Sequence, residues 1–217
     1  QRRFWRSEQH YVHKRQARGE EGSCWSAKSR DFSAPPGQEQ RIYGIFSLHA
    51  LRRRDELHLT QKIISKPADL LAQIPTLAAI KPDLLVVFGS VAHFSAPDFA
   101  DTLHAGLPGA ALIGCTTAGE ISADGVNDNT CTLTAIKLDK TTLTRASTTL
   151  TGMDDSFAAG ERLGQQLAAT DLKAVLVFGP GVLINGSALV DGITSIIGSN
   201  TPITGGLAGD GGAFKQT

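Results

Sequence analysis

Residues 84–90 read LLVVFGS and residues 174–180 read AVLVFGP, at a constant offset of 90 residues. An unbroken apolar run that ends in glycine is typical of a buried strand followed by a tight turn. The same offset places IGCTTAGE at 113–120 opposite ITGGLAGD at 203–210. Each copy therefore predicts a strand, a helix, a second strand and a loop of small residues, which together form a β-α-β unit with parallel strands.

The helical positions between these strands follow the same offset. Three residues of the first copy correspond pairwise to three of the second, namely Phe99, Asp101 and Leu103 to Leu189, Asp191 and Ile193. We interpret the pattern as an internal duplication. The alternative is that two β-α-β units resemble each other by chance, because apolar strands followed by glycine are common. The predicted fold class is α/β, with a parallel-rich sheet built from two related β-α-β halves.

A threonine-rich segment separates the two copies. Residues 130–138 alternate polar and apolar side chains, and Asp139 and Lys140 can turn the chain into a second strand at 141–150. Alternating strands joined by a short polar turn are typical of a hairpin. The sequence therefore predicts an antiparallel hairpin inserted between the two halves.

The remaining elements follow from apolar periodicity and from helix breakers. Strands are predicted at 41–47, 83–88, 110–114, 173–178 and 202–204, and helices at 67–80, from about 97, from 154 or 155, and at 187–197. The helix that begins near Asp155 is expected to turn Phe157, Gly160, Leu163 and Leu167 toward the core.

The 217 residues include 41% hydrophobic and 19% charged side chains, an ordinary globular composition with zero net charge. Residues 1–66 hold 14 Lys and Arg against 7 Asp and Glu, and the rest of the chain holds the reverse. We divide the chain into a basic, disordered or non-native arm at 1–40, a lead-in segment at 41–66 and an α/β domain at 67–217. No nucleic-acid-binding signature accompanies the basic half, so nucleic acid is not an expected partner.

The cysteines and the apolar runs of the sequence indicate the cellular compartment of the protein. Cys24, Cys115 and Cys131 form an odd set without metal-type spacing, which favours a reducing compartment. The basic opening lacks the apolar centre of a signal peptide, and no apolar run approaches the roughly 20 residues of a membrane-spanning helix. The protein is therefore expected in the cytoplasm. Because the chain begins with Gln1 and stops abruptly at Thr217, we expect a fragment of a longer protein.

The predicted ligand site lies beyond the carboxyl ends of the parallel strands, where loops converge and glycine lets a backbone approach a ligand closely. Glu120 and Asp210 are equivalent in the two copies and can accept hydrogen bonds from a ligand amine or from loop amides. The alternative is that the glycines and acids of these loops only form tight turns. The predicted lining is Gly89, Ser90, Cys115, Thr116, Thr117, Gly119, Glu120, Gly205, Gly206, Gly209 and Asp210.

Three stretches resemble the FIST family, the sensory domain of bacterial and some eukaryotic signalling proteins. They are PDLLVVFGS at 82–90, IGCTTAGEI at 113–121 and ITGGLAGDG at 203–211. The resemblance covers about 67–217 and implies an input domain for a small ligand, with amino acids proposed. It also implies a C-terminal companion domain, expected to be missing after Thr217, and an output partner such as a histidine kinase, a cyclic-dinucleotide enzyme or a methyl-accepting receptor.

Two other chemistries come from different classes of function. Some relatives in the family are haem proteins that sense nitric oxide, and His93 or Cys115 can serve as an axial ligand, although no cofactor is required. Cys115 with His93 and Glu120 also supplies the thiol, base and acid of a cysteine-dependent enzyme. No nucleophile elbow, phosphate-binding loop or zinc-type spacing is found, so we predict a binding module rather than an enzyme, with no metal site.

Overall fold

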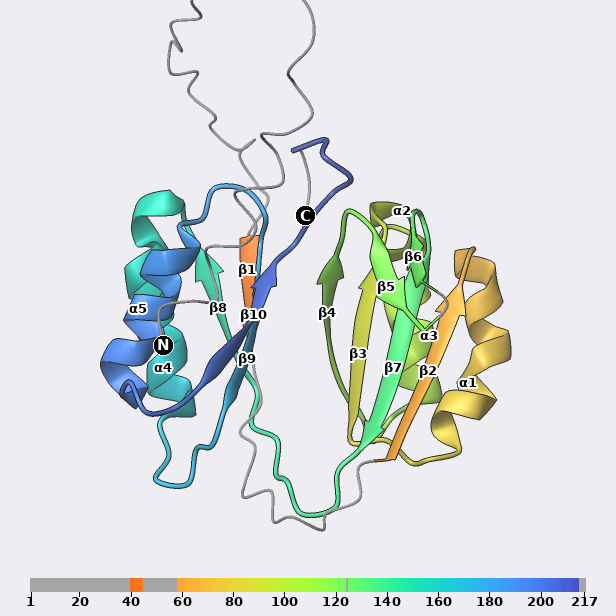
Figure 1. The fold of residues 1–217 in the computed structure, drawn as a ribbon, viewed down its shortest axis with the longest axis horizontal. Helices are drawn as coiled ribbons and strands as arrows, with labels where there is room; N and C mark the ends of the chain where they lie inside the picture. The colour runs from red at the N-terminus through yellow and green to blue at the C-terminus, as the bar shows by residue number, and fades with distance from the viewer. Residues whose placement is uncertain (1–39, 45–57, 124, 215–217) are drawn as a thin grey trace, which may run out of the picture. The chain divides into compact units, whose positions relative to one another are not determined.

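Two buried strands, β3 and β9, organise the described part of the chain, which comprises residues 40–44, 58–123 and 125–214 of a computed structural model (Figure 1). β3 (Leu84–Gly89) and β9 (Val175–Gly179) are the two apolar runs of the repeat. Each pairs in parallel with the second strand of its copy, β3 with β4 (Ala111–Thr116) and β9 with β10 (Ile203–Leu207). The two parallel pairs of the sequence prediction are confirmed.

Each parallel pair is extended by two antiparallel strands into a four-stranded sheet. The first sheet has the order β2-β7-β3-β4, with β2 at His58–Ile64 and β7 at Cys131–Lys137. The second has the order β10-β9-β1-β8, with β1 at Gln40–Gly44 and β8 at Ala146–Leu150. A short ribbon, β5 (Glu120–Ser122) and β6 (Gly125–Asn127), follows β4 in the chain. The α/β class is therefore confirmed, but the predicted parallel-rich sheet is wrong, because four of the six strand pairings within the two four-stranded sheets are antiparallel.

Helices flank each sheet (Figure 1). The first sheet is accompanied by a 3-10 turn at Pro67–Asp69, α1 at Leu70–Ala78, α2 at Val91–Phe94 and α3 at Phe99–Gly106. The second is accompanied by a 3-10 turn at Met153–Asp155, α4 at Ser156–Leu167 and α5 at Gly186–Ile197.

Two hydrophobic clusters lie between the helices and their sheets. In the first, the fully buried Leu133 of β7 belongs to the same cluster as Leu77 of α1 and the buried Leu103 of α3. In the second, Ile42 of β1 belongs to the same cluster as Leu163 of α4. Leu133, Ile42 and Leu163 have no exposed surface. Burying side chains of this size contributes roughly 1.5–3 kcal/mol each, so β7 and β1 are central to the two cores.

The two helices of the second sheet approach each other through glycines. A Cβ on Gly160 of α4 would collide with the carbonyl oxygen of Leu189, and a Cβ on Gly192 of α5 would collide with that of Phe157. Only glycine permits this backbone contact. The close packing leaves Phe157 outside the core with 43% of its surface exposed, so its predicted inward position is wrong, whereas Gly160 is buried as predicted.

The predicted hairpin is wrong. β7 pairs with β2 on one side and β3 on the other, while β8 pairs with β1 in the other sheet. Asp83 accepts hydrogen bonds from Lys137 Nζ at 2.8 Å and from the amide of Leu138 at 2.7 Å, which fixes the end of β7 against β3. Alternation of side chains identifies a strand but not its partner, because pairing is a long-range property.

The strand registers also correct the ungapped alignment of the two copies. Val86 of β3 lies opposite Ile113, whereas Leu176 of β9 lies opposite Thr204, one residue beyond the expected Ile203. The connection between the paired positions is therefore one residue longer in the second copy. As a result, Asp210 does not occupy the position that matches Glu120.

The other predicted elements are present with shifted ends. The expected helix at 67–80 is a 3-10 turn followed by α1, which continues through Pro75. Residues 1–39 of the predicted arm at 1–40, and residues 45–47 of the predicted strand at 41–47, lie outside the described residues. The domain boundaries at 40 and 66 stay predictions.

Candidate functional site

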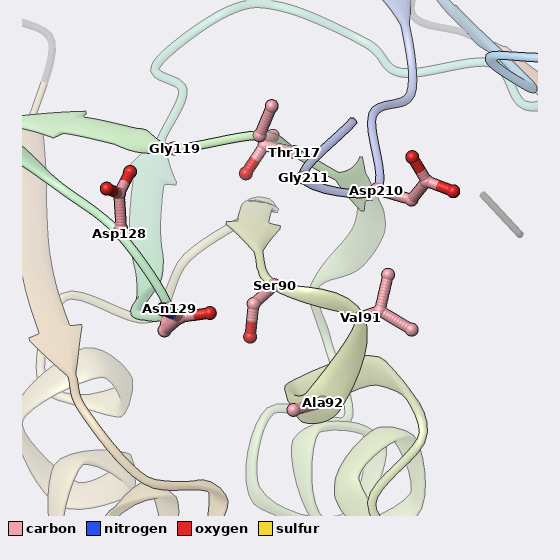
Figure 2. A pocket seen from close by; sticks show the side chains of 10 residues that line it. Ser90, Val91, Ala92, Thr117, Gly119, Asp128, Asn129, Asp210 and Gly211 are labelled. Carbon is pink, nitrogen blue, oxygen red and sulfur yellow. The ribbon is translucent and has the colours of Figure 1, made fainter. Parts of the chain in front are cut away.

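The loops that follow β3 and β4 surround a cavity of about 330 Å³ (Figure 2). Gly89 and Thr116, the last residues of the two strands, are paired neighbours, so the loops after them begin side by side. Four chain segments contribute to the wall, and the lining residues are Ser90, Val91, Ala92, Thr117, Ala118, Gly119, Asp128, Asn129, Asp210 and Gly211. The cavity lies where the sequence places the ligand site, at the carboxyl ends of parallel strands.

Backbone hydrogen bonds hold these four segments together. The amide of Ser90 donates to the carbonyl of Thr130 at 3.0 Å, and the amide of Thr117 donates to the carbonyl of Gly89 at 3.0 Å. The amide of Gly209 donates to the carbonyl of Thr116 at 2.8 Å and so brings the loop after β10 to the cavity. These bonds satisfy main-chain groups that leave the sheets, and they position the lining before any ligand arrives.

Glu120 does not line the cavity but connects two of its loops, the one that contains Thr117 and the one that contains Thr130. Its side chain is 2% exposed and accepts hydrogen bonds from Thr117 Oγ1 at 2.6 Å, Thr130 Oγ1 at 2.6 Å and the Thr130 amide at 3.0 Å. A buried carboxylate with several donors is well satisfied and fixes the geometry of its partners. The observed partners of Glu120 are those of a loop organiser, which is one of the two roles that the sequence leaves open.

The acids that line the cavity are Asp128 and Asp210. Figure 2 shows them on opposite sides, with Ser90 and Thr117 between them. Asp210 also accepts a hydrogen bond from the amide of Phe214 at 2.8 Å, which anchors its loop. Two carboxylates, two hydroxyls and the amide of Asn129 give the cavity a strongly acidic and hydrogen-bonding character.

The cavity also depends on glycine at 119. Gly119 has φ +153°, and a Cβ there would lie 3.0 Å from Asp128 Oδ1. A side chain at this position would strain the backbone and displace the acid. The predicted role of Gly119 in the lining thus has a physical basis.

Of the predicted site residues, the structure brings four to the cavity, namely Ser90, Thr117, Gly119 and Asp210. The others among the described residues lie elsewhere: Gly89, Cys115, Thr116, Glu120, Gly205, Gly206 and Gly209. Gly89 packs against Cys131, and Gly205 packs against the backbone of Val177, so both serve strand packing. Binding by these residues stays a prediction.

Sequence reasoning missed Asp128 and Asn129. They precede β7, an antiparallel neighbour of β3, and therefore reach the same sheet edge from the amino-terminal end of a strand. The prediction considered only the carboxyl ends of parallel strands. The polar run NDN at 127–129, directly before an alternating strand, is the signal that points to them once β7 is known to pair with β3.

The hydrogen bonds of His93 and Glu120, two of the residues proposed for nucleophilic catalysis, lead to other partners. Burial raises the pKa of the Cys115 thiol to about 11, so this side chain is protonated at neutral pH. His93 is 1% exposed, and its Nδ1 lies 2.9 Å from Ser90 Oγ, while the hydrogen bonds of Glu120 go to threonines. Burial also lowers the pKa of His93, although Glu120 and Asp69 oppose that shift.

The arrangement does not fit a haem at His93. An axial ligand must present a ring nitrogen to an open, largely apolar pocket. The ring of His93 is buried with its centroid 6.2 Å from that of Phe99, and the nearby cavity is lined by hydroxyls and carboxylates. Within the described residues, no group of three or more His, Cys, Asp or Glu side chains is placed to hold a metal ion.

Comparison with models of known protein families identifies the family of this chain. The model of the FIST N domain family matches residues 83–217, which is more than half of the chain and includes every lining residue of the cavity. No curated protein and no solved structure matches significantly. None of the helices in the described ranges has the length and hydropathy needed to cross a bilayer.

Proposed function

The chain belongs to the FIST family, a family of sensory domains in signal transduction, and from this premise we propose that its cavity receives a small ligand that carries an amino group. The observation that carries the proposal is the position of Asp128 and Asp210 on opposite sides of the cavity. A protonated amine is the common ligand group that donates several hydrogen bonds and neutralises carboxylates.

An amino acid suits the remaining polar groups of the lining. Its ammonium group can bind one of the two lining aspartates, and its carboxylate can accept hydrogen bonds from Ser90 Oγ and from the side-chain amide of Asn129. The cavity volume of about 330 Å³ is at the small end of the range for ligand pockets, which favours a compact ligand.

Ligand binding would act on the loops rather than on the sheets. The lining comes from the segments that follow β3, β4, β6 and β10, so a ligand in contact with all four favours the arrangement in which they are closest. We propose that an attached output protein, such as a histidine kinase or a cyclic-dinucleotide enzyme, reads this shift. The FIST C-terminal domain is the proposed neighbour through which it passes.

We also propose that the two parallel pairs descend from one duplicated β-α-β unit. Support comes from the sequence repeat and from a shared packing device. A Cβ on Gly114 of β4 would collide with the carbonyl oxygen of Val87, and a Cβ on Gly205 of β10 would collide with that of Val177. The two valines are 90 residues apart, at the offset of the repeat.

The test is a thermal-shift screen of the full chain against amino acids, simple amines and nucleotides. A ligand that binds only the native state stabilises it by about 2.7 kcal/mol at 100 times its Kd. We expect the shift of the active compound to be lost in Asp128→Asn and in Asp210→Asn. Asp191→Asn, an exposed acid on α5, is the matched control and keeps the shift.

Two results would contradict the proposal. One is a shift that survives in both cavity variants. The other is a preference for acids without an amino group over the corresponding amino acids.

A further inference from the structure

The two sheets have the same strand pattern but draw one strand each from the opposite part of the chain. In chain order, residues 40–116 contain β1, β2, α1, β3, α2, α3 and β4, and residues 131–207 contain β7, β8, α4, β9, α5 and β10. We call these ranges the first and the second half. Read from the antiparallel edge, the sheets have the orders β2-β7-β3-β4 and β8-β1-β9-β10.

We propose that the domain is a pair of related halves that have exchanged their first strands. β2, β3 and β4 of the first half match β8, β9 and β10 of the second by their place in the sheet and by the direction of each pairing. The position between them is filled by β7 in the first sheet and by β1 in the second. Each half thus completes the sheet of the other.

The pairings around the exchanged strands support this equivalence. β7 is antiparallel to both β2 and β3, and β1 is antiparallel to both β8 and β9. A further main-chain bond recurs at the strand ends. The amide of Thr117 donates to the carbonyl of Gly89 at 3.0 Å, and the amide of Ala208 donates to the carbonyl of Gly179 at 2.9 Å. Chance similarity of two β-α-β units does not require a matched third and fourth strand.

The exchange determines which half supplies the chemistry of the cavity. Asp128 and Asn129 lie within three residues of the start of β7, so the exchanged strand carries them to the loops of the first half. Asp210 and Gly211 follow β10 and also come with the second half, while Ser90 and Thr117 belong to the strand ends of the first half. If the proposed amine ligand binds there, it bridges the two halves, and this consequence rests on the proposed function.

The exchange itself is tested without a ligand, through two double variants that share one cysteine. Gln61 Nε2 of β2 donates to Thr134 Oγ1 of β7 at 3.1 Å, so these side chains face each other. We expect Gln61→Cys with Thr134→Cys to form a disulfide under mild oxidation, identified by mass spectrometry. Thr134→Cys with Arg145→Cys is the matched control, because these residues would face each other if β7 and β8 formed a local hairpin.

The outcomes separate the two arrangements. A link from 134 to 61 and none from 134 to 145 supports the exchange, and a link only to 145, or to neither, overturns it. Since no ligand takes part, failure of the proposed amine site leaves this result unaffected, and the reverse also holds.

The second exchanged strand is tested by hydrogen exchange of the full chain. Ile42→Ala in β1 should speed amide exchange in β8 and β9 by at least about tenfold, although β2 is its nearer neighbour in sequence. Leu133→Ala in β7 should do the same in β2 and β3. Both side chains are fully buried, which makes the variants comparable. An effect of Ile42→Ala on β2 and β3 as large as that on β8 and β9 would overturn the proposal.

Discussion

Replacing Glu120 by alanine should be among the most damaging changes to the loops of the cavity. The variant leaves three donors without their acceptor, namely Thr117 Oγ1, Thr130 Oγ1 and the Thr130 amide. A hydrogen bond to a charged group contributes about 1.5–3 kcal/mol, and the loss of a buried partner adds the desolvation of the orphan. The hydroxyls can turn to other acceptors but the amide cannot, so we expect unfolding free energy to fall by about 3 to 4 kcal/mol.

Glutamine at 120 is the matched control. Its carbonyl oxygen can accept both donors of Thr130, and its amide can donate to Thr117 Oγ1, so all three contacts can be kept while the charge is lost and the Thr117 hydroxyl turns its own hydrogen elsewhere. The expected decrease is about 1 kcal/mol. Urea unfolding of the full chain measures both variants, with a midpoint shift of roughly 1 to 3 M for alanine. The reasoning is refuted if Glu120→Ala stays within about 1 kcal/mol of the wild type, or if Glu120→Gln is equally damaging.

Three further predictions concern packing, charge and reactivity. Gly205→Ala should destabilise the protein by about 2 kcal/mol or more in chemical denaturation, because φ is +142° and the strand backbone leaves no room, whereas Gly206→Ala, with nothing near its Cβ position, should be close to neutral. The Arg162 hydrogen bonds lower the pKa of Asp155 from 3.8 to about 2, so their stabilisation is present above about pH 4 and is lost as pH falls to about 2. Asp155→Asn should therefore be less stable by about 1 to 2 kcal/mol at neutral pH and should converge with the wild type in acid, as followed by thermal unfolding. Cys115 should react with iodoacetamide more slowly in the native protein than in urea, because burial raises its pKa to about 11, and equal rates in peptide-resolved alkylation would contradict that burial.

Local patterns predicted the elements well where one physical signal dominates. The continuous apolar runs of β3 and β9 are short, end in glycine and are rich in valine, which is typical of buried strands. The helix α5 begins where Asn185 accepts a hydrogen bond from the amide of Ala188, within one residue of the predicted start. These signals depend on residues a few positions apart, so one sequence is sufficient to read them.

Strand partners were the first property that local patterns could not supply. Residues 131–137 alternate as expected, and Leu133 and Ala135 are fully buried, yet the strand lies between two strands of the first half. A strand with two antiparallel neighbours is stabilised on both edges, which a hairpin at the end of a sheet is not. The eight residues at 138–145 are long enough for the chain to leave the first sheet before β8. Whether β7 pairs with β8 or with β2 and β3 therefore depends on the packing of the whole core.

The wrong pairing of Glu120 with Asp210 has the same cause, because it also depends on strand partners that local patterns do not supply. An ungapped alignment pairs Glu120 with Asp210 and treats them as one kind of ligand group, but the registers of the two parallel pairs differ by one residue. Glu120 is turned inward onto the threonines beside β7, and the acid opposite Asp210 is Asp128, which only reaches the cavity because β7 lies next to β3. A carboxylate buried with three donors and one on a cavity wall have identical local sequence signals, since both follow or precede a strand in a small-residue loop. The two kinds of carboxylate differ in the strand that lies beside them. The strand order must therefore be known before a sequence motif can be used to locate the site.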